Sequence, residues 1–390
     1  MLRLLFPLMA FAAAAVSITV ELQSPAPDGT VCLYGGCRFE QMTATMQETG
    51  ATPAGLAALL REDPSNPHTW ATFGEYLVGI GDSSRAEEAF AQALAAGGGL
   101  APVLMRVANF NFAHERTAQG LHLVPRILAQ TSDYNEILFS YIQRAGLNAA
   151  DVVGTTIPAS PRVARSWLVW TREHSSTSEV LTTWSWMQRE KLTDERTANE
   201  TTNALWQRKA YLEARQVWEE FVGPSGSEQQ ANLLTNSRFQ TEPTTALFDW
   251  DLSPRPGVSC TRGDGLDVRF LGDVNVADAG VRQRVVVSPG VYRFTAELSA
   301  ENLTTDQGVY FEIADAEDSS RLRRESPLVE GTMVRTAVAV YVPVTEETRV
   351  LQVQLRRTPS LRFDNKLAGV LHIHRVELAP VPQSSPAPKP

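Results

Sequence analysis

The sequence lacks the short motifs of the common catalytic centres. No Gly-x-Ser-x-Gly elbow, P-loop or His-Glu-x-x-His zinc motif occurs in its 390 residues. The glycine run 97–99 follows a helical pattern and precedes no Lys-Ser/Thr, so it predicts the end of a helix. Carboxylates are numerous, but a sequence alone does not place two of them at glycosidase separation. We expect a non-enzyme with no catalytic residues and no cofactor; the open alternative is a carbohydrate-active enzyme with unidentified carboxylates.

Cysteine is also scarce, with three residues in the chain. Cys32 and Cys37 flank a Gly-Gly turn that would let their side chains approach, so we expect a disulfide, with free thiols as the alternative. Two thiols with no nearby His or third Cys are too few for a four-coordinate zinc site. Cys260 has no evident partner in the sequence and is interpreted as a small core residue.

An excess of positive charge is missing as well. The formal net charge is −9, which argues against a nucleic-acid partner, because such a protein needs a basic surface to neutralise phosphates. Hydrophobic residues make up 43% of the chain and charged residues 20%, values typical of folded proteins. The length predicts two folded domains.

An apolar segment begins the chain. Arg3 precedes an almost continuous apolar run over residues 4–20, so residues 1–23 are predicted to be a signal peptide or a membrane anchor. Residues 24–50, rich in Pro and Gly at their start, form a predicted linker. We expect the protein to be exported, either periplasmic or anchored in the inner membrane with its bulk outside the cytoplasm. Contact with the membrane is expected only through this N-terminal segment.

Residues 51–223 have the periodicity of successive amphipathic helices. One stretch has large residues at helical spacing, then a Gly-rich turn, then small residues and a phenylalanine: Trp70, Phe73, Gly74 and Leu77, followed by Ala86, Phe90 and Ala93. This stretch, clearest over residues 63–98, resembles a tetratricopeptide repeat. The resemblance implies an α-solenoid that binds a protein partner.

Self-similarity weakens after the first repeat. A shift of 34 residues preserves hydrophobicity but not identity, and Pro125 then falls where the second helix of a repeat should be uninterrupted. The number of repeats is therefore left open. Six tryptophans follow at helical spacing and are interpreted mainly as packing residues, with lining of a peptide groove as the alternative: Trp167, Trp170, Trp184, Trp186, Trp206 and Trp218.

After a linker at 224–231, residues 232–379 consist of strand-length runs, the first two at 233–243 and 248–252, separated by Gly, Pro and Asp turns. Such runs without intervening helices predict an antiparallel β-sandwich of the jelly-roll type. Asn236 and Phe239, then Trp250, then the run 281–285 stand in an order that resembles galactose-binding-like jelly rolls of carbohydrate-binding modules. The resemblance implies the fold and a polysaccharide ligand. Residues 380–390 form a Pro-rich tail predicted to be disordered.

Alternation along three of these strands predicts a glycan-binding face. If the three strands share one sheet, an aromatic ring, amides and charged groups gather on its outer side, where they would suit sugar rings and hydroxyls: Tyr310, Gln352, Gln354, Arg356, Arg293 and Glu297. The alternative is an ordinary solvated face of an antiparallel sheet.

No metal site is predicted in this half. His372 and His374 share a strand face without an assignable third ligand, so a surface pair is favoured over a metal site. Several turn aspartates would suit a structural Ca²⁺, but turn formation explains them equally well.

The sequence as a whole favours a multidomain α + β binding protein of the cell envelope. A helical solenoid would bind a protein partner, and a β-sandwich would bind a glycan, in a role in exopolysaccharide assembly or export. The alternative is a purely structural assembly scaffold with no small ligand.

Overall fold

The computed structural model describes residues 52–222, 232–244, 246–304, 307–361 and 366–382. The chain divides into two compact units, 1–167 and 168–390, and each is described by itself. The predictions for segments 1–23 and 24–50, for the Cys32–Cys37 pair and for linker 224–231 lie outside the described residues, as does most of the tail.

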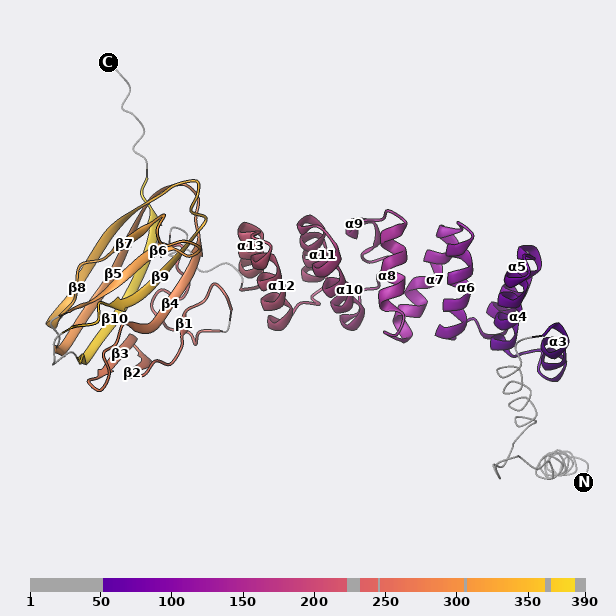
Figure 1. Ribbon diagram of the computed structural model, residues 1–390, viewed down its shortest axis with the longest axis horizontal. Coiled ribbons are helices and arrows are strands. Elements are labelled where there is room, and N and C mark those ends of the chain that lie inside the picture. The colour runs from indigo at the N-terminus through magenta and orange to yellow at the C-terminus, as the bar shows by residue number, and fades with distance from the viewer. Residues whose placement is uncertain (1–51, 223–231, 245, 305–306, 362–365, 383–390) are drawn as a thin grey trace, which may run out of the picture. The chain divides into compact units, whose positions relative to one another are not determined.

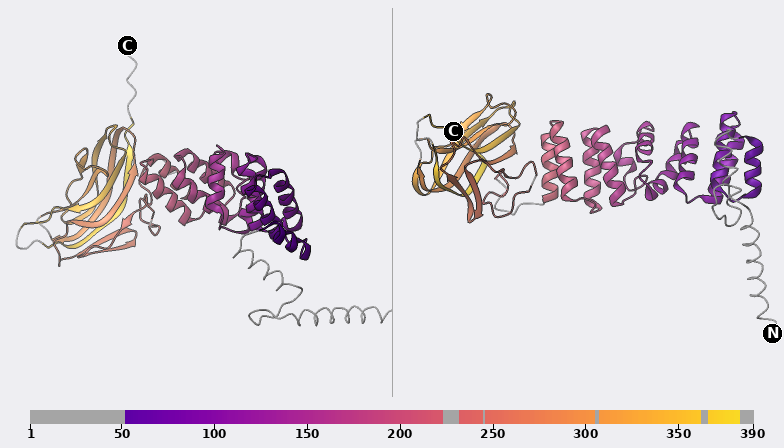
Figure 2. Two further views of the ribbon diagram at one scale, coloured as in Figure 1. Left: turned by 45° about the vertical axis from the view of Figure 1, so that its right-hand side comes forward. Right: turned by 60° about the horizontal axis from the view of Figure 1, so that its bottom comes forward.

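Helices make up the described part of the first unit (Figure 1). In order they are α3 (Pro53–Glu62), α4 (Pro67–Gly79), α5 (Ser83–Gly97), α6 (Ala101–Ala113), α7 (Thr117–Gln130), α8 (Asn135–Arg144), the single turn α9 (Ala149–Val152) and the start of α10 (Pro161–His174). Helix α4 packs against α5, and α6 packs against α7. The indigo-to-purple helices stay stacked side by side in both views of Figure 2. This is the repeated helical hairpin that the sequence predicts.

The start of the first repeat is encoded locally. The Asn66 side chain accepts hydrogen bonds from the backbone N–H groups of His68 and Thr69, at 3.0 and 3.2 Å. Pro67 occupies the first helical turn, where its missing N–H has no intrahelical partner to lose. Asp82 then caps α5 through the backbone N–H of Arg85 at 3.1 Å.

Close contact between the two helices of a repeat depends on glycine. A Cβ added to Gly74 of α4 would lie 2.9 Å from the ring of Phe90 in α5. The second repeat reverses the arrangement, since a Cβ on Gly120 of α7 would lie 2.8 Å from the ring of Phe112 in α6. In each pair the glycine leaves space that the opposing aromatic ring fills.

Helix α7 continues through Pro125, which lies inside its 14 residues. Proline removes one hydrogen bond and crowds the preceding turn, at a cost of about 3 kcal/mol in a helix interior. Val124, Ile127 and Leu128 are buried around it, and burial of such side chains is worth about 1.5–3 kcal/mol each. Packing therefore outweighs the local preference for a break.

Arginines from following helices bind carbonyls at the ends of earlier ones. Arg126 of α7 donates to the oxygen of Gly98, which caps α5, and Arg162 of α10 donates to the oxygen of Leu128 near the end of α7. In the second unit Arg208 donates to the oxygen of Ser175 at 2.9 Å, just after α10. A cation at a helix C-terminus satisfies open carbonyls and complements the helix dipole.

The second unit continues the helices and then changes to strands. Its helices are the end of α10, α11 (Thr177–Arg189), α12 (Glu195–Gln207) and α13 (Tyr211–Val222). Its strands are β1 (Asp251–Leu252), β2 (Val258–Gly263), β3 (Gly265–Leu271), β4 (Asp278–Val286), β5 (Gly290–Thr304), β6 (Val309–Asp315), β7 (Arg323–Glu325), β8 (Gly331–Val344), β9 (Val350–Arg357) and β10 (Ala368–Pro380).

Two antiparallel sheets form the predicted β-sandwich. The first sheet has the strand order β1-β4-β9-β6-β7, and the second has the order β2-β3-β10-β5-β8. Apolar side chains from both sheets fill the space between them. Phe294 of β5 and Phe311 of β6 meet there with ring centroids 5.1 Å apart.

Two strands expected near the start of the sandwich do not form as predicted. Residues 233–243 have no strand structure, and the Trp-bearing run contributes only the two-residue β1. Asn236 and Phe239 have positive φ angles of 45° and 54°, a conformation that ends extended structure. Phe239 is nonetheless buried against Trp250, with ring centroids 4.8 Å apart, so this segment closes the sandwich core as a loop.

Most of the helical tryptophans are packing residues. Four are buried, with exposures of 5% or less: Trp167, Trp184, Trp186 and Trp218. Trp170 and Trp206 are half-buried. Cys260 of β2 is a free thiol packed against the sandwich core, and burial raises its pKa to about 11.

Candidate functional site

The outer side of the first sheet carries most of the predicted glycan-binding residues. Strand β9 pairs with β4 on one side and with β6 on the other. In this register Arg356 is opposite Tyr310, and Gln354 lies between Arg282 and Glu312. Their neighbours along each strand, such as Val353, belong to the core between the sheets.

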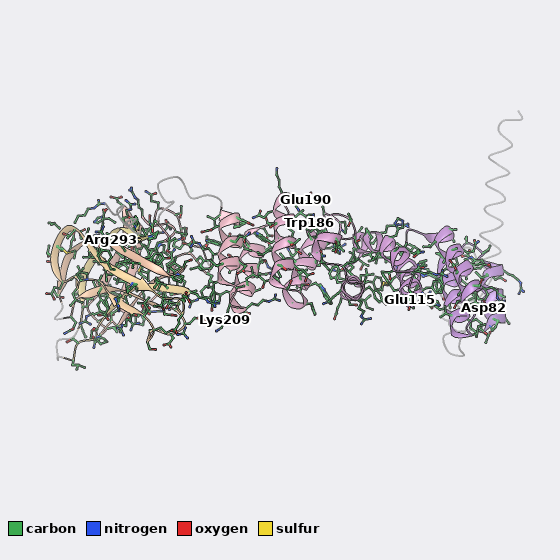
Figure 3. All side chains as sticks on the ribbon, turned by 90° about the horizontal axis from the view of Figure 1, so that it is seen from above. Asp82, Glu115, Trp186, Glu190, Lys209 and Arg293 are labelled. Atoms are coloured by element: carbon green, nitrogen blue, oxygen red, sulfur yellow. The ribbon has the colours of Figure 1, made fainter. Side chains whose placement is uncertain are left out.

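The condition that the three strands share one sheet is not met. Strand β5, which carries Arg293 and Glu297, belongs to the second sheet and pairs with β8 and β10. Arg293 is exposed there and is labelled in Figure 3. Glu297 is held by Arg335 of β8, with a nitrogen–oxygen distance of 2.5 Å. The alternation of β5 is as expected, but alternation does not reveal which sheet a strand joins.

The remaining predicted residues form a covered polar layer. Tyr310 is 4% exposed and Gln354 is 5% exposed, so the tyrosine ring is not offered to solvent. Gln352 donates to the side-chain oxygen of Gln354 at 2.9 Å. Glu312 lies 2.8 Å from Arg323 and 3.7 Å from Arg356. Glu312 thus lies between two arginines, while the buried Nε of Arg356 makes no hydrogen bond among the described residues.

A cleft of about 650 Å³ opens beside this layer. One side is the sheet surface of β4 and β9, and the other side is the segment before and around β1, which we call the cleft wall (residues 242–244 and 246–253). The main polar residues that line the cleft are Glu242, Asp249, Asp251, Arg262, Arg282, Arg284 and Gln352. Trp250 also lines it, but is 1% exposed and donates its indole N–H to the Thr235 oxygen at 3.0 Å.

Gln283 fastens the cleft wall to the sheet. Its amide nitrogen donates to the hydroxyl of Thr235 at 2.7 Å and to the carbonyl oxygen of Phe248 at 3.0 Å. The Thr235 hydroxyl donates in turn to the Phe248 oxygen at 3.1 Å. Gln283 is 2% exposed, and buried hydrogen bonds of this kind fix the loop position because breaking them leaves polar groups unsatisfied.

Acidic groups of the cleft are paired or hydrogen-bonded. Arg282 contacts Asp251 through two nitrogens, each at 2.7 Å. Burial opposes ionisation of Asp251, but hydrogen bonds from Ser253 and Arg282 outweigh it, and the pKa of this carboxyl lies below its usual value. Asp249 accepts from the backbone N–H of Thr244 at 2.8 Å and of Trp250 at 2.7 Å.

Among the described charged residues that line the cleft, Arg284 is the exception, because no carboxylate lies at ion-pair distance from it. Burial first, and then the positive charge of Arg282, lower the pKa of its guanidinium. The guanidinium lies 5.7 Å from the ring centroid of Trp206 on α12, in the same unit. Trp206 in turn contacts Phe248 edge-on at 5.7 Å.

The sequence contains a local signal for one side of this cleft. The run 281–285 alternates Val, Arg, Gln, Arg and Val, which places Arg282 and Arg284 on one strand face. The cleft wall gives no periodic signal, because it is held by Gln283, far along the chain from Thr235 and Phe248.

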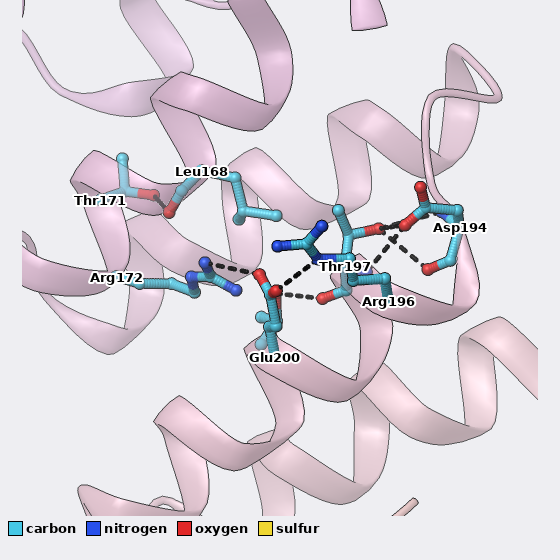
Figure 4. Close-up of polar contacts among 8 residues, drawn as sticks. Leu168, Thr171, Arg172, Asp194, Arg196, Thr197 and Glu200 are labelled. Carbon is cyan, nitrogen blue, oxygen red and sulfur yellow. Dashed lines mark hydrogen bonds and ion pairs between the residues drawn. The ribbon is translucent and has the colours of Figure 1, made fainter. Parts of the chain in front are cut away.

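Polar contacts join every second helix of the run, that is, corresponding helices of neighbouring repeats. In the first unit Arg106 of α6 binds Glu75 and Thr72 of α4, the latter at 2.9 Å, and Tyr141 of α8 donates to Asn109 of α6 at 3.0 Å. In the second unit Arg172 of α10 reaches Glu200 of α12 at 3.1 Å, and Arg196 contacts the same carboxylate at 2.8 Å (Figure 4). The hydrogen bond from Arg196 lowers the pKa of Glu200 most; burial opposes it, and the hydrogen bond from Arg172 adds to it, so the pKa lies below its usual range.

A groove of about 700 Å³ lies between α5, α6 and α7 in the first unit. Phe90 and Leu94 of α5, Phe110 of α6 and His122 and Leu123 of α7 line it. A largely apolar groove between helices suits an apolar side chain of a peptide.

The histidine pair lies on the second sheet. His372 contacts Asp267 at 2.7 Å, and His374 contacts the hydroxyl of Ser299 at 2.8 Å. Among the residues that the structure describes, no group of three or more His, Cys, Asp or Glu side chains could hold a metal ion. None of the described helices is long and apolar enough to cross a membrane.

Comparison with known proteins gives matches only at the level of structure, and each covers part of the chain. No family model and no curated protein matches the chain. A carbohydrate-binding module, TmCBM61 solved with β-1,4-galactotriose, is 16% identical, with a TM-score of 0.28 over 38% of this chain and 99% of its own. PilF of Pseudomonas aeruginosa is 17% identical, with a TM-score of 0.24 over 49% of this chain and 78% of its own. YrrB, a tetratricopeptide-repeat protein described as having an unusual peptide-binding site, is 9% identical, with a TM-score of 0.25 over 43% and 90%.

The structural neighbours therefore include both predicted classes, tetratricopeptide-repeat proteins and carbohydrate-binding modules. The described chain itself combines a run of helices over residues 53–222 with two antiparallel sheets, as the sequence predicts.

Proposed function

We propose that this protein is a non-catalytic binding protein whose β-sandwich binds a glycan in the cleft beside β4. The observation that carries the proposal is the cleft itself, about 650 Å³ in volume, with amide and guanidinium groups on the sheet surface and carboxylates on the cleft wall. Sugar hydroxyls both donate and accept hydrogen bonds, and this lining offers both kinds of partner. Sheet residues hold such groups in fixed positions, which lowers the entropy lost on binding.

Polar contacts would dominate this binding. Trp250 and Tyr310 are buried, so neither ring face is open for stacking against a sugar. Gln352 of β9 is half-buried at the cleft floor, and its oxygen and nitrogen can serve a hydroxyl on either side.

The engagement of both described aspartates of the cleft supports a binding role over hydrolysis. A glycosidase needs one carboxyl group that stays protonated and a second that acts as base or nucleophile. Asp251 has a lowered pKa and is bound to Arg282, so it is ionised and occupied. Asp249 is committed to backbone N–H groups of its own turn.

The helical repeats would bind a protein partner, with the apolar groove of α5, α6 and α7 as the contact surface. Together the two activities suit a protein of the cell envelope that recruits a partner to a polysaccharide, in exopolysaccharide assembly or export. An alkaline phosphatase fusion at the C-terminus tests the location, because the enzyme is active only after export.

A glycan array tests the proposed function. The full chain is compared with Gln352→Ala, which removes an amide from the cleft, and with Arg335→Ala, an exposed change on the second sheet. Saturable binding that Gln352→Ala weakens and Arg335→Ala preserves supports the cleft as the site. Binding that Arg335→Ala abolishes instead would move the site to the other sheet. No binding to any glycan would leave the sandwich as a structural domain of a scaffold.

A further inference from the structure

We infer that the cleft selects an acidic glycan, with Arg284 contacting the carboxylate or sulfate group of the sugar. The inference rests on the proposed glycan site and narrows it to one ligand class. It follows from the pairing of charges in the cleft and from the way Arg284 is held.

Three arginines and three carboxylates line the cleft, and Arg284 is the one arginine of this described set that makes no ion pair with a carboxylate. Arg282 is held by Asp251 at 2.7 Å, and Arg262 by Glu242 at 3.5 Å. Asp249 is occupied by the hydrogen bonds of its turn. Within the described ranges, no carboxylate lies at ion-pair distance from Arg284.

Arg284 is also prepared to meet an anion. The guanidinium carbon of Arg284 lies over the Trp206 ring, 5.7 Å from the ring centroid. The ring shields the guanidinium without neutralising its charge. The side chain is half-buried, and burial together with the charge of Arg282 lowers its pKa. A bound anion would compensate the removal of this charge from water, and electrostatic attraction is stronger there than at an open surface.

The geometry of arginine suits this role. A guanidinium presents several N–H groups in one plane and can bind a carboxylate or a sulfate through two parallel hydrogen bonds. Hydroxyl groups of the same sugar would remain for Gln352, which lines the cleft on the neighbouring strand opposite Arg284. A neutral sugar would leave the guanidinium without an anion.

Matched oligosaccharides provide the test. The full chain is titrated calorimetrically with a hexuronate oligosaccharide and its carboxyl-reduced neutral counterpart, and with a sulfated oligosaccharide and its desulfated counterpart. We expect at least one acidic member to bind about tenfold more tightly than its neutral counterpart, as one charge-assisted contact provides. The preference should shrink as salt is raised, because ions screen the attraction. The two pairs distinguish carboxylate from sulfate.

Variants assign the preference to one residue. Arg284→Gln should remove the difference between acidic and neutral members, and Arg284→Lys should keep part of it, because it retains the charge without the bidentate geometry. Arg269→Gln changes an exposed arginine on β3 of the second sheet; it is the matched control and should leave the preference unchanged. Because the acid-to-neutral ratio is measured first on the unmodified chain, poor folding of a variant does not remove the test.

The outcomes separate the inference from the proposed function. If neutral and acidic members bind equally, the acidic selectivity is wrong while the glycan site stands. If the preference survives in Arg284→Gln, another cation provides it and the assignment is wrong. If no oligosaccharide binds the unmodified chain, the proposed function fails and the inference fails with it.

Discussion

Replacing Gly74 by alanine tests how the first repeat is packed. Its new methyl group would lie 2.9 Å from the ring of Phe90, closer than carbon atoms approach in well-packed proteins. Such overpacking costs about 1–3 kcal/mol, while alanine in place of glycine gains about 0.5–1 kcal/mol inside a helix. Gly79, at the end of the same helix, has nothing within 4 Å of an added Cβ, so Gly79→Ala is subject only to the second effect.

We therefore expect Gly74→Ala to be less stable than Gly79→Ala by about 1–3 kcal/mol. Urea unfolding followed by the helical circular dichroism signal measures the difference. The change Phe90→Leu removes the opposing ring, and it should cost less in the Gly74→Ala background than in the unmodified chain. Equal stability of the two glycine variants, or strict additivity with Phe90→Leu, would show that α4 and α5 are not packed as described.

Two further changes test contacts in the second unit. Tyr211 donates a hydrogen bond to Glu317 at 2.5 Å. Burial and this bond raise the pKa of Tyr211 to about 12. Tyr211→Phe should therefore lower the free energy of unfolding by about 1–2 kcal/mol below pH 10, and by progressively less as pH rises from 10 towards 12. Urea unfolding midpoints, measured below pH 10 and near pH 12, report the loss of stability. Tyr341→Phe, which changes a tyrosine that is 59% exposed, is the control. An effect of Tyr211→Phe that does not change with pH would contradict the reasoning. Asp194 caps α12 by accepting a hydrogen bond from the backbone N–H of Thr197 at 2.8 Å. Asp194→Ala should therefore lower the urea midpoint by an amount corresponding to about 1 kcal/mol. An unchanged midpoint would show that this cap does not stabilise the helix.

Helices and strand faces could be predicted because their signals are local. Asn66 and Pro67 mark a helix start within two residues, and the spacing from Trp70 to Leu77 repeats with the period of the helix. In the same way, alternation alone places Gln352 and Gln354 on the outer side of β9.

The pairing of strands and the cleft wall could not be predicted, because both depend on distant residues. Nothing within β5 indicates that Arg293 would join β8 and β10 instead of β6, since many strand orders satisfy the same alternation. Thr235 belongs to the run 233–243, which the sequence predicts to be a strand. In the structure it lies in a loop that is hydrogen-bonded to Gln283 of β4. The cleft therefore depends on tertiary contacts between distant residues, although the alternation that places two of its arginines on one strand face can be read from the sequence.

Hydrogen–deuterium exchange of the full chain, with and without the tightest-binding oligosaccharide from the array, tests the central claim most directly. The account predicts that the ligand slows exchange in the cleft wall and in β4, and leaves β5 and β8 on the second sheet unchanged. Protection confined to β5 and β8, or to the helices, with none in the cleft wall would contradict the claim that this cleft is where the protein binds a glycan.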